Sequence, residues 1–174
     1  MRIKGLDYIR VLGIFLVVFY HFFSNFIPGG FLGVNILFVL SGFLITYHLL
    51  DEIYKNKEIN IRKFYYKRFV RIFPPVLLMV FLTSLTCFFI NKDYSVRFFD
   101  QFISAITFNY NIFEIVRGGS YEGQFIKQLF MPTWSLAIEV HFYLLWPLVL
   151  TLIANKFKNM EHFEKKYSSL LIKT

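Results

Sequence analysis

Two ionisable side chains, Arg10 and His21, share the first long apolar stretch of the sequence, DYIRVLGIFLVVFYHFF. His21 follows Arg10 by eleven positions. At 3.6 residues per turn, eleven residues complete three turns plus roughly 20°, so a helix places both side chains on one side, about 16 Å apart along its axis. Asp7 lies one turn before Arg10, about 40° from the line of His21. Ionisable groups on an apolar helix are costly in hydrocarbon and indicate a functional site. A neutral imidazole in such a site can remove a proton from a hydroxyl group.

Each of these side chains also has a simpler interpretation when it is taken alone. Arg10 can be a charge that extends to the membrane surface, and His21 can be a buried histidine bonded to a neighbouring helix. Arg10 and His21 share one face of the helix with Asp7, and this shared face favours a functional site over the simpler interpretations.

Long apolar runs are the elements that position these residues. They cover residues 11–27, 31–50, 72–90 and 133–154, each close to the length that crosses a bilayer. Hydrophobic residues make up 56% of the 174 positions and charged residues only 17%. We therefore predict an all-α fold, a polytopic membrane helical bundle with four spanning helices. The net charge of +8 lies mainly outside the apolar runs, which fits membrane topology better than nucleic-acid binding. We expect a lipid bilayer around the chain and no nucleic-acid partner.

Residues 99–116 are long enough to span a membrane but carry several polar side chains. If they do not span, 15 of the 19 Lys and Arg residues fall on one side, against 12 if they do. Positive residues gather on the cytoplasmic side. The distribution therefore favours a re-entrant or interfacial segment, with both termini cytoplasmic, over the alternative of five spanning helices.

A basic segment precedes the third apolar run and contains Arg68 and Arg71, three residues apart on a predicted helix. Residues at this spacing lie on the same side of a helix. Two arginines at a membrane mouth can bind phosphate groups, although anchoring to anionic lipids explains the same pair. We expect Pro74 and Pro75 to begin the third apolar helix, because proline is tolerated at a helix start.

The second and fourth runs also carry residues that do not suit contact with lipid. Glu139 lies in the fourth run with Tyr143 one turn later on the same face, whereas His141 is expected to face elsewhere. A carboxylate at that depth needs a partner or a wet cavity. Ser41 and Gly42 in the second run are small enough to let another helix approach closely. No cluster of metal ligands is apparent, so we expect no bound metal.

Four stretches of the sequence resemble, in order, the successive signatures of the membrane-bound acyltransferase-3 family. They are GLDYIRVLGIFLVVFYHF, GGFLGVNILFVLSGFLIT, FYYKRFVRIFPP and TWSLAIEVHFYLLWP. The resemblance implies an enzyme that transfers an acyl group, usually acetyl, from acyl-coenzyme A to a hydroxyl of a bacterial surface glycan or a secreted small molecule. It implies the cytoplasmic (inner) membrane of a bacterium as the location and acyl-coenzyme A as a substrate, with no permanently bound cofactor.

The resemblance also implies roles for the matching residues. They are the catalytic residues His21, Arg10, Asp7 and Glu139, the donor-binding residues Arg68 and Arg71, and the pocket-lining residues Ser41, Gly42 and Tyr143. The sequence departs from the common family pattern at Asn35 and at Val140–His141, which leaves the choice of acceptor open.

Members of the family generally have more spanning helices than four. We expect residues 1–154 to be the N-terminal part of the acyltransferase domain and residues 155–174 to be a basic cytoplasmic tail of a truncated chain. A further chain that supplies the missing helices is then an expected partner. The alternatives are an inactive remnant or partner subunit of such an enzyme, and a small transport component with its ionisable residues along a polar path.

Overall fold

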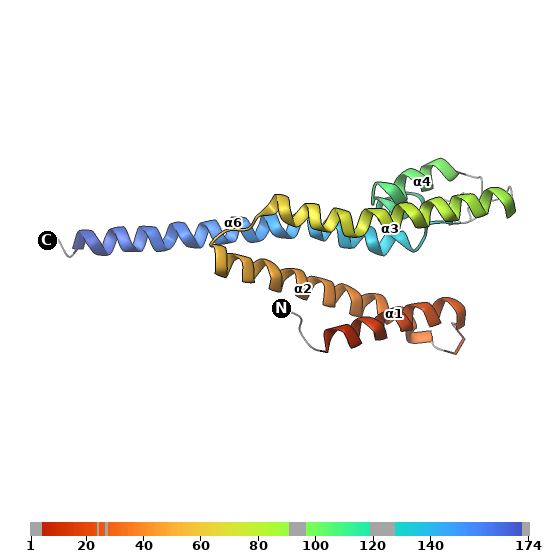
Figure 1. Ribbon diagram of the computed structural model, residues 1–174, viewed down its shortest axis with the longest axis horizontal. Helices are drawn as coiled ribbons and strands as arrows, with labels where there is room; N and C mark the ends of the chain where they lie inside the picture. The colour runs from red at the N-terminus through yellow and green to blue at the C-terminus, as the bar shows by residue number, and fades with distance from the viewer. Residues whose placement is uncertain (1–4, 24, 27, 91–96, 119–127, 172–174) are drawn as a thin grey trace. The chain divides into compact units, whose positions relative to one another are not determined.

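The computed structural model describes residues 5–23, 25–26, 28–90, 97–118 and 128–171. In these ranges the regular elements are all helical (Figure 1): α1 (Leu6–Phe23), the 3-10 helix η1 (Pro28–Phe31), α2 (Leu32–Asn56), α3 (Ile61–Ile90), α4 (Phe98–Ile106), α5 (Tyr110–Gly118) and α6 (Thr133–Leu171). Four helical stretches are long and apolar enough to cross a membrane: Leu6–Phe23, Pro28–Asn56, Ile61–Phe89 and Thr133–Lys156. The predicted all-α bundle with four spanning helices is thereby confirmed.

The chain forms two compact units. One consists of Met1–Ile59 and Pro147–Thr174, and the other of Asn60–Trp146. The first unit contains α1 and α2, and the second contains α3, α4 and α5. Helix α6 contributes to both, because the boundary falls at Pro147.

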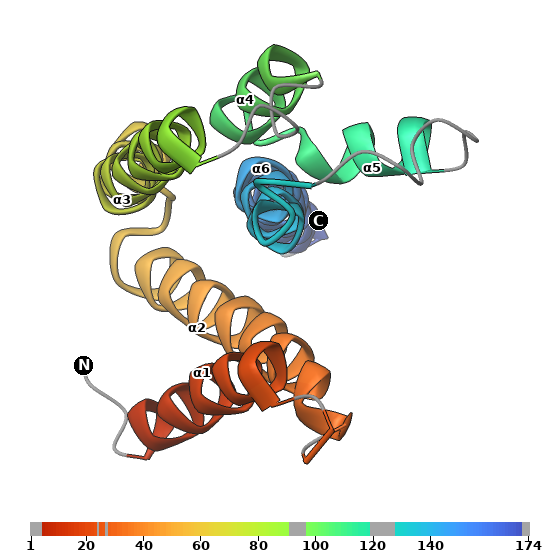
Figure 2. The same ribbon diagram turned by 90° about the vertical axis from the view of Figure 1, so that its right-hand side faces the viewer.

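Helices α1 and α2 form a hairpin, joined through η1, in which they lie side by side (Figures 1 and 2). Glycines make this close contact possible. A Cβ at Gly30 would lie 2.6 Å from the carbonyl oxygen of Leu16, and one at Gly33 would lie 2.9 Å from Cγ2 of Val17 and would collide with the carbonyl oxygen of Gly13. The two backbones therefore touch where a side chain would keep them apart.

Helix α3 begins at Ile61, so the prediction that it starts at Pro74 and Pro75 is wrong; both prolines lie inside the helix. The start is set by Asn60, whose Oδ1 accepts a 3.0 Å hydrogen bond from the backbone N–H of Lys63. This is an N-cap, which satisfies one of the N–H groups that a helix start leaves unpaired. Internal prolines are tolerated more readily in membrane helices than in soluble ones.

Residues 99–116 do not form one spanning helix, because a turn separates α4 from α5 (Figure 2). Phe108 has a left-handed φ of 56° at this turn, and the backbone N–H of Asn109 returns to the carbonyl oxygen of Ser104 over 2.9 Å. Each helix has nine residues and rises only about 13 Å. The structure therefore favours the re-entrant or interfacial alternative over five spanning helices.

A buried amide holds α4, α5 and the approach to α6 together. Gln101 is fully buried, and its Oε1 accepts hydrogen bonds from the Tyr110 hydroxyl over 3.1 Å and from the backbone N–H of Leu129 over 2.9 Å. The rings of Tyr110 and Phe130 pack with Val76 and Val80 of α3. The two short helices are thus fixed against α3 by an apolar core with a satisfied polar centre.

The pH dependence of stability in this region is expected to change when Glu114 is replaced by Gln. Burial raises the pKa of the Glu114 carboxyl above its ordinary value of 4.5, although the hydrogen bond from Gln128 lowers it. A raised pKa in the folded state gives stability that is present below the unfolded-state pKa and lost as the pH rises through the folded-state value. We expect Glu114→Gln to lose less stability than the wild type as the pH rises above about 4.5.

Thermal unfolding of the detergent-purified protein, measured from pH 4 to pH 8, checks this expectation. Glu58→Gln is the matched control, because Glu58 is an exposed carboxylate. Identical pH dependence in the wild type and in Glu114→Gln would contradict the prediction.

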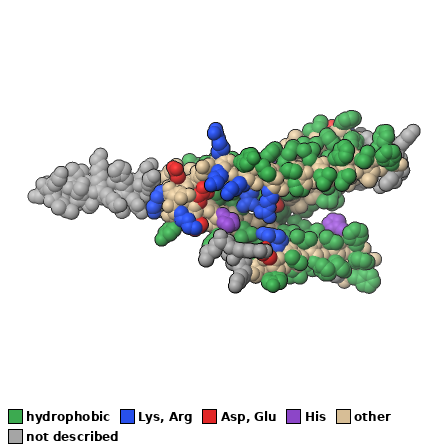
Figure 3. All heavy atoms as spheres, in the orientation of Figure 1, with side chains coloured by type: hydrophobic (Ala, Val, Ile, Leu, Met, Phe, Trp, Pro, Cys, Tyr) green, Lys and Arg blue, Asp and Glu red, His purple; other side chains and the backbone are tan. Residues whose placement is uncertain are grey.

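Basic side chains gather near the start of α3, and hydrophobic side chains cover its later turns (Figure 3). The basic group within the unit is Arg62, Lys63, Lys67, Arg68 and Arg71. Several other lysines and arginines used for the orientation, including Arg2, Lys4, Lys92 and Lys127, lie outside the described residues. The cytoplasmic placement of both termini therefore stays a prediction.

Candidate active site

Asp7, Arg10 and His21 all lie on α1, an unbroken helix from Leu6 to Phe23. Nη1 of Arg10 donates a hydrogen bond to Oδ1 of Asp7 over 3.3 Å, and the two groups also form an ion pair. Both side chains are partly buried, with about a third to a half of their surface exposed. Pairing reduces the cost of holding these two charges on an apolar helix. The helical phase predicted for Arg10 and His21 holds, because no break interrupts α1 between them.

The imidazole of His21 is oriented by its own helix. Its Nδ1 lies 2.8 Å from the carbonyl oxygen of Val17, one turn earlier. A carbonyl oxygen only accepts hydrogen bonds, so Nδ1 must carry the proton in this contact. In the neutral ring, Nε2 is then the unprotonated nitrogen with an available lone pair. The side chain is exposed, so Nε2 is free to meet a substrate hydroxyl.

Helix α2 covers a different part of α1 from the one that carries these groups. The close contacts that the glycines of η1 and α2 make on α1 fall on Gly13, Leu16, Val17 and Tyr20, whose centre lies about 70° around the helix from Arg10. The line through Arg10 and His21 lies beside these contacts, where Arg10 is partly buried and His21 is exposed. The hairpin thus fixes α1 in place while the ionisable side of the helix stays accessible.

Among the described residues, the close approach of another helix that was expected at Gly42 is not made. A Cβ at Gly42 would meet no atom within 4 Å. The carbonyl oxygen of Gly42 accepts a 2.8 Å hydrogen bond from Thr46, and Ser41 is partly buried on α2. Tight contact occurs instead at Gly13, Gly30 and Gly33, because the turn at η1 brings the start of α2, rather than its middle, against α1.

Arg68 lies in an aromatic setting in the second unit. Its guanidinium carbon is 5.4 Å from the ring centre of Phe64 on α3 and 5.4 Å from that of Tyr143 on α6. Both distances suit cation–π contacts. Among the described residues none accepts a hydrogen bond from this guanidinium. A partly buried cation with unused donors is suited to bind an anion.

Arg71 lies one turn after Arg68 and is exposed. Arg68 is close enough to Arg71 and Glu139 to interact with both charges. The two guanidinium groups therefore differ in environment: Arg68 is seated against rings, whereas Arg71 extends from the helix. A phosphate group bound by both would contact one guanidinium seated against aromatic rings and one that is exposed.

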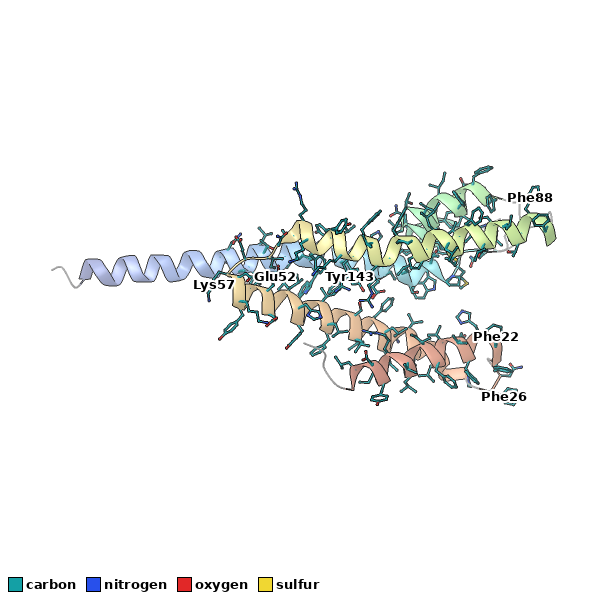
Figure 4. The ribbon with its side chains drawn as sticks, in the orientation of Figure 1. Phe22, Phe26, Glu52, Lys57, Phe88 and Tyr143 are labelled. Atoms are coloured by element: carbon teal, nitrogen blue, oxygen red, sulfur yellow. The ribbon has the colours of Figure 1, made fainter. Side chains whose placement is uncertain are left out.

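Glu139 and Tyr143 share a face of α6, and both lie close enough to Arg68 of α3 to interact with it. The hydroxyl of Tyr143 donates a hydrogen bond to Oε1 of Glu139 one turn earlier, and Tyr143 is only 6% exposed. Figure 4 labels Tyr143 on the stretch of α6 that runs beside α3. The hydroxyl of Tyr65 on α3 donates a 2.7 Å hydrogen bond to the carbonyl oxygen of Leu144. Helices α3 and α6 are thus joined by side chains at this level.

His141 faces away from this group. Its Nδ1 lies 3.4 Å from Nδ2 of Asn111 on α5, which agrees with the expectation that His141 and Glu139 point in different directions. In the part of the chain that the structure describes, no three His, Cys, Asp or Glu residues are placed to hold a metal ion.

Sequence reasoning missed the two α3 aromatics that meet this group, Phe64 and Tyr65. Phe64 lies one turn before Arg68, and this i, i+4 spacing could have suggested its contact with the guanidinium. No local pattern indicates that Tyr65 bonds to a carbonyl 79 residues later.

Residues 3–160 match the family model of an acyltransferase domain, that of the acyltransferase-3 family. The chain belongs to this family. OatA, an O-acetyltransferase of Staphylococcus aureus NCTC 8325, is 34% identical over 156 residues, which cover 90% of this chain and 26% of OatA. The peptidoglycan O-acetyltransferase OatA of Listeria monocytogenes is 33% identical over 158 residues, 90% of this chain and 25% of that protein. A putative O-acetyltransferase of S. aureus COL is 33% identical over 148 residues, 85% of this chain and 24% of its own length.

The chain thus spans about a quarter of the length of the curated relatives it matches. No solved structure matches it. The family resemblance expected from the four sequence signatures is confirmed. Together with its four long apolar helices, family membership identifies the chain as a multi-pass membrane protein.

Proposed function

We propose that this protein takes part in O-acyl transfer, moving an acetyl group from acetyl-coenzyme A to a hydroxyl of a cell-wall glycan. Family membership over residues 3–160 supports acyl transfer. The single structural observation that carries the proposal is the oriented imidazole of His21 on the same unbroken helix as the Asp7–Arg10 pair. The name of the Listeria relative, a peptidoglycan O-acetyltransferase, makes a peptidoglycan sugar the first acceptor to test.

In the proposed mechanism, Nε2 of His21 accepts the proton of the acceptor hydroxyl. The hydroxyl oxygen attacks the thioester carbonyl, forming the new ester bond as the carbon–sulfur bond breaks. The coenzyme A thiolate leaves and takes the proton from the imidazolium, which restores neutral His21. The hydrogen bond from Nδ1 to the Val17 carbonyl holds the ring in the tautomer that this sequence needs.

The remaining site residues position the reactants. Arg10, held by Asp7, orients the donor at the start of α1, while Arg68 and Arg71 bind its phosphate groups. Glu139 orders the bound donor from α6, and Ser41 and Gly42 are pocket-lining residues on α2. The chemistry is provided by ionisable side chains and the thioester, so the proposal includes no resident cofactor.

The membrane placement follows from the same proposal. Residues 1–154 act as the N-terminal part of the acyltransferase domain in the bacterial inner membrane, with the basic residues and the donor on the cytoplasmic side. The acceptor hydroxyl is presented towards the outer side.

Mass spectrometry of cell-wall glycans tests the proposed function. Cells that carry the complete locus containing this chain are compared with cells from which it is deleted, after growth with isotopically labelled acetate. Acetyl esters that carry the label and depend on the locus support the proposal. Unchanged glycan esters, together with no locus-dependent acylated small molecule in the medium, would refute it.

A further inference from the structure

The contacts of Tyr143 combine two functions in one side chain. Its ring face lies against the Arg68 guanidinium, and its hydroxyl donates a hydrogen bond to Glu139. The residue is almost completely buried. Tyr143 is therefore the direct link between the cation on α3 and the carboxylate on α6.

The ring contact fixes the direction in which Arg68 can bind. A guanidinium lying against aromatic faces keeps its N–H groups at the edge of its plane. Phe64 contacts the same guanidinium from α3 itself. Two rings from two helices restrict the arginine more than either would alone, so its donors are held ready for an anion at little entropic cost.

The hydroxyl contact has a different consequence. A carboxylate in a membrane helix needs hydrogen-bond donors to remain in place. The Tyr143 hydroxyl supplies one from a single turn along α6. This bond selects a Glu139 rotamer that points along the face shared with Tyr143, towards α3. Loss of the hydroxyl would leave Arg68 against a ring but would release the carboxylate.

We propose that Tyr143 is a positioning residue with separable parts: its ring seats Arg68 for the donor phosphates, and its hydroxyl orients Glu139 for the transfer step. This inference rests on the proposed function, because it assigns the two parts to donor binding and to turnover. The competing explanation is plain packing, in which any large apolar side chain at this position would serve equally well.

Three substitutions separate these possibilities in the protein expressed from its complete locus and purified in detergent. Tyr143→Phe keeps the ring and removes the hydroxyl, Tyr143→Leu removes both, and Phe64→Leu removes the other ring. Phe142→Leu is the matched control, since Phe142 stacks on Trp146 along α6. Equilibrium binding of coenzyme A and of 3′-dephospho-coenzyme A is measured first, and then KM for acetyl-coenzyme A and kcat.

We expect Tyr143→Phe to bind coenzyme A within about twofold of the wild type while kcat falls about tenfold or more. We expect Tyr143→Leu and Phe64→Leu each to weaken coenzyme A binding about tenfold. Phe64→Leu should keep the wild-type kcat, whereas Tyr143→Leu should lower it, because it also lacks the hydroxyl. The control should behave as the wild type. Size-exclusion profiles identify any variant that fails to fold, and Phe64→Leu then still tests the role of the rings.

Two results would overturn the inference: wild-type kcat in Tyr143→Phe, or wild-type coenzyme A affinity in a folded variant that lacks either ring. Failure of the proposed function would look different. In that case the wild-type protein itself would bind no coenzyme A, or would bind it without producing any acetylated product.

Discussion

Replacement of His21 by Ala is expected to lower the rate of acyl transfer by about 100- to 10,000-fold, the usual contribution of a general base. The loss follows from removal of Nε2, the only imidazole nitrogen left to accept a proton while Nδ1 bonds to the Val17 carbonyl. His21 is exposed and lies near the end of α1, so membrane insertion and the α1–α2 hairpin should be unchanged. Labelled-acetate incorporation into cell-wall glycans gives the rate, and membrane fractionation gives the amount of inserted protein.

A matched histidine elsewhere on the hairpin controls for nonspecific effects. His48 is an exposed residue of α2 to which no role in transfer is assigned, and His48→Ala is expected to retain wild-type activity. Transfer at the wild-type rate in His21→Ala would remove His21 from the mechanism. Trapping of an acylated His21 in the wild-type protein would instead replace direct transfer with a two-step route through the imidazole.

Replacement of Gly33 by Ala is expected to destabilise the α1–α2 hairpin by about 1–3 kcal/mol, the usual cost of overpacking. The added methyl group would collide with the Gly13 carbonyl oxygen and would lie 2.9 Å from Cγ2 of Val17 and 3.0 Å from Cβ of Leu16. Two of these atoms belong to groups fixed by the helix backbone, so relief requires α1 to move away from α2. Hydrogen-exchange mass spectrometry of α1 should show faster exchange in the variant.

Gly42→Ala provides the matched control for stability, because a Cβ at that position of the same helix meets no atom within 4 Å. Alanine there should be neutral or should stabilise α2 by up to about 1 kcal/mol, since glycine is unfavourable inside a helix. The two substitutions are chemically identical, but only Gly33→Ala is expected to destabilise the protein. Equal stability of the two variants would show that the close glycine contact does not hold the hairpin together.

Much of the fold can be predicted from the sequence because membrane helices are defined by continuous apolar length. The predicted apolar run 11–27 lies mainly in the helical stretch Leu6–Phe23, and the predicted run 133–154 lies in the stretch Thr133–Lys156. The start of α3 after the Asn60 cap is harder to predict. The cap depends on one polar side chain, and the Pro74–Pro75 pair further along the sequence is a stronger signal for a helix start. The turn at Phe108 also had no clear signal, since bulky residues rarely adopt a left-handed backbone.

The candidate site also has some features that the sequence predicts and others that it does not. The shared face of Arg10 and His21 depends only on helical phase, which spacing determines. The contact of Arg68 with Tyr143 joins two helices far apart in the sequence, so it depends on packing that one sequence does not specify. The importance of Gly33 over Gly42 has the same origin, because both are helical glycines and only the neighbour differs.

The adjacent prolines inside α3 also affect the solvation of the arginine pair. Proline has no backbone N–H, so Pro74 and Pro75 leave the carbonyl oxygens of Val70 and Arg71 without their usual intrahelical donors. Such oxygens in a membrane helix draw in water or a polar ligand. Arg71 therefore carries a cationic side chain on a residue whose own carbonyl oxygen attracts water. Water or a polar ligand bound at these oxygens would lower the cost of keeping Arg68 and Arg71 ionised close to hydrocarbon.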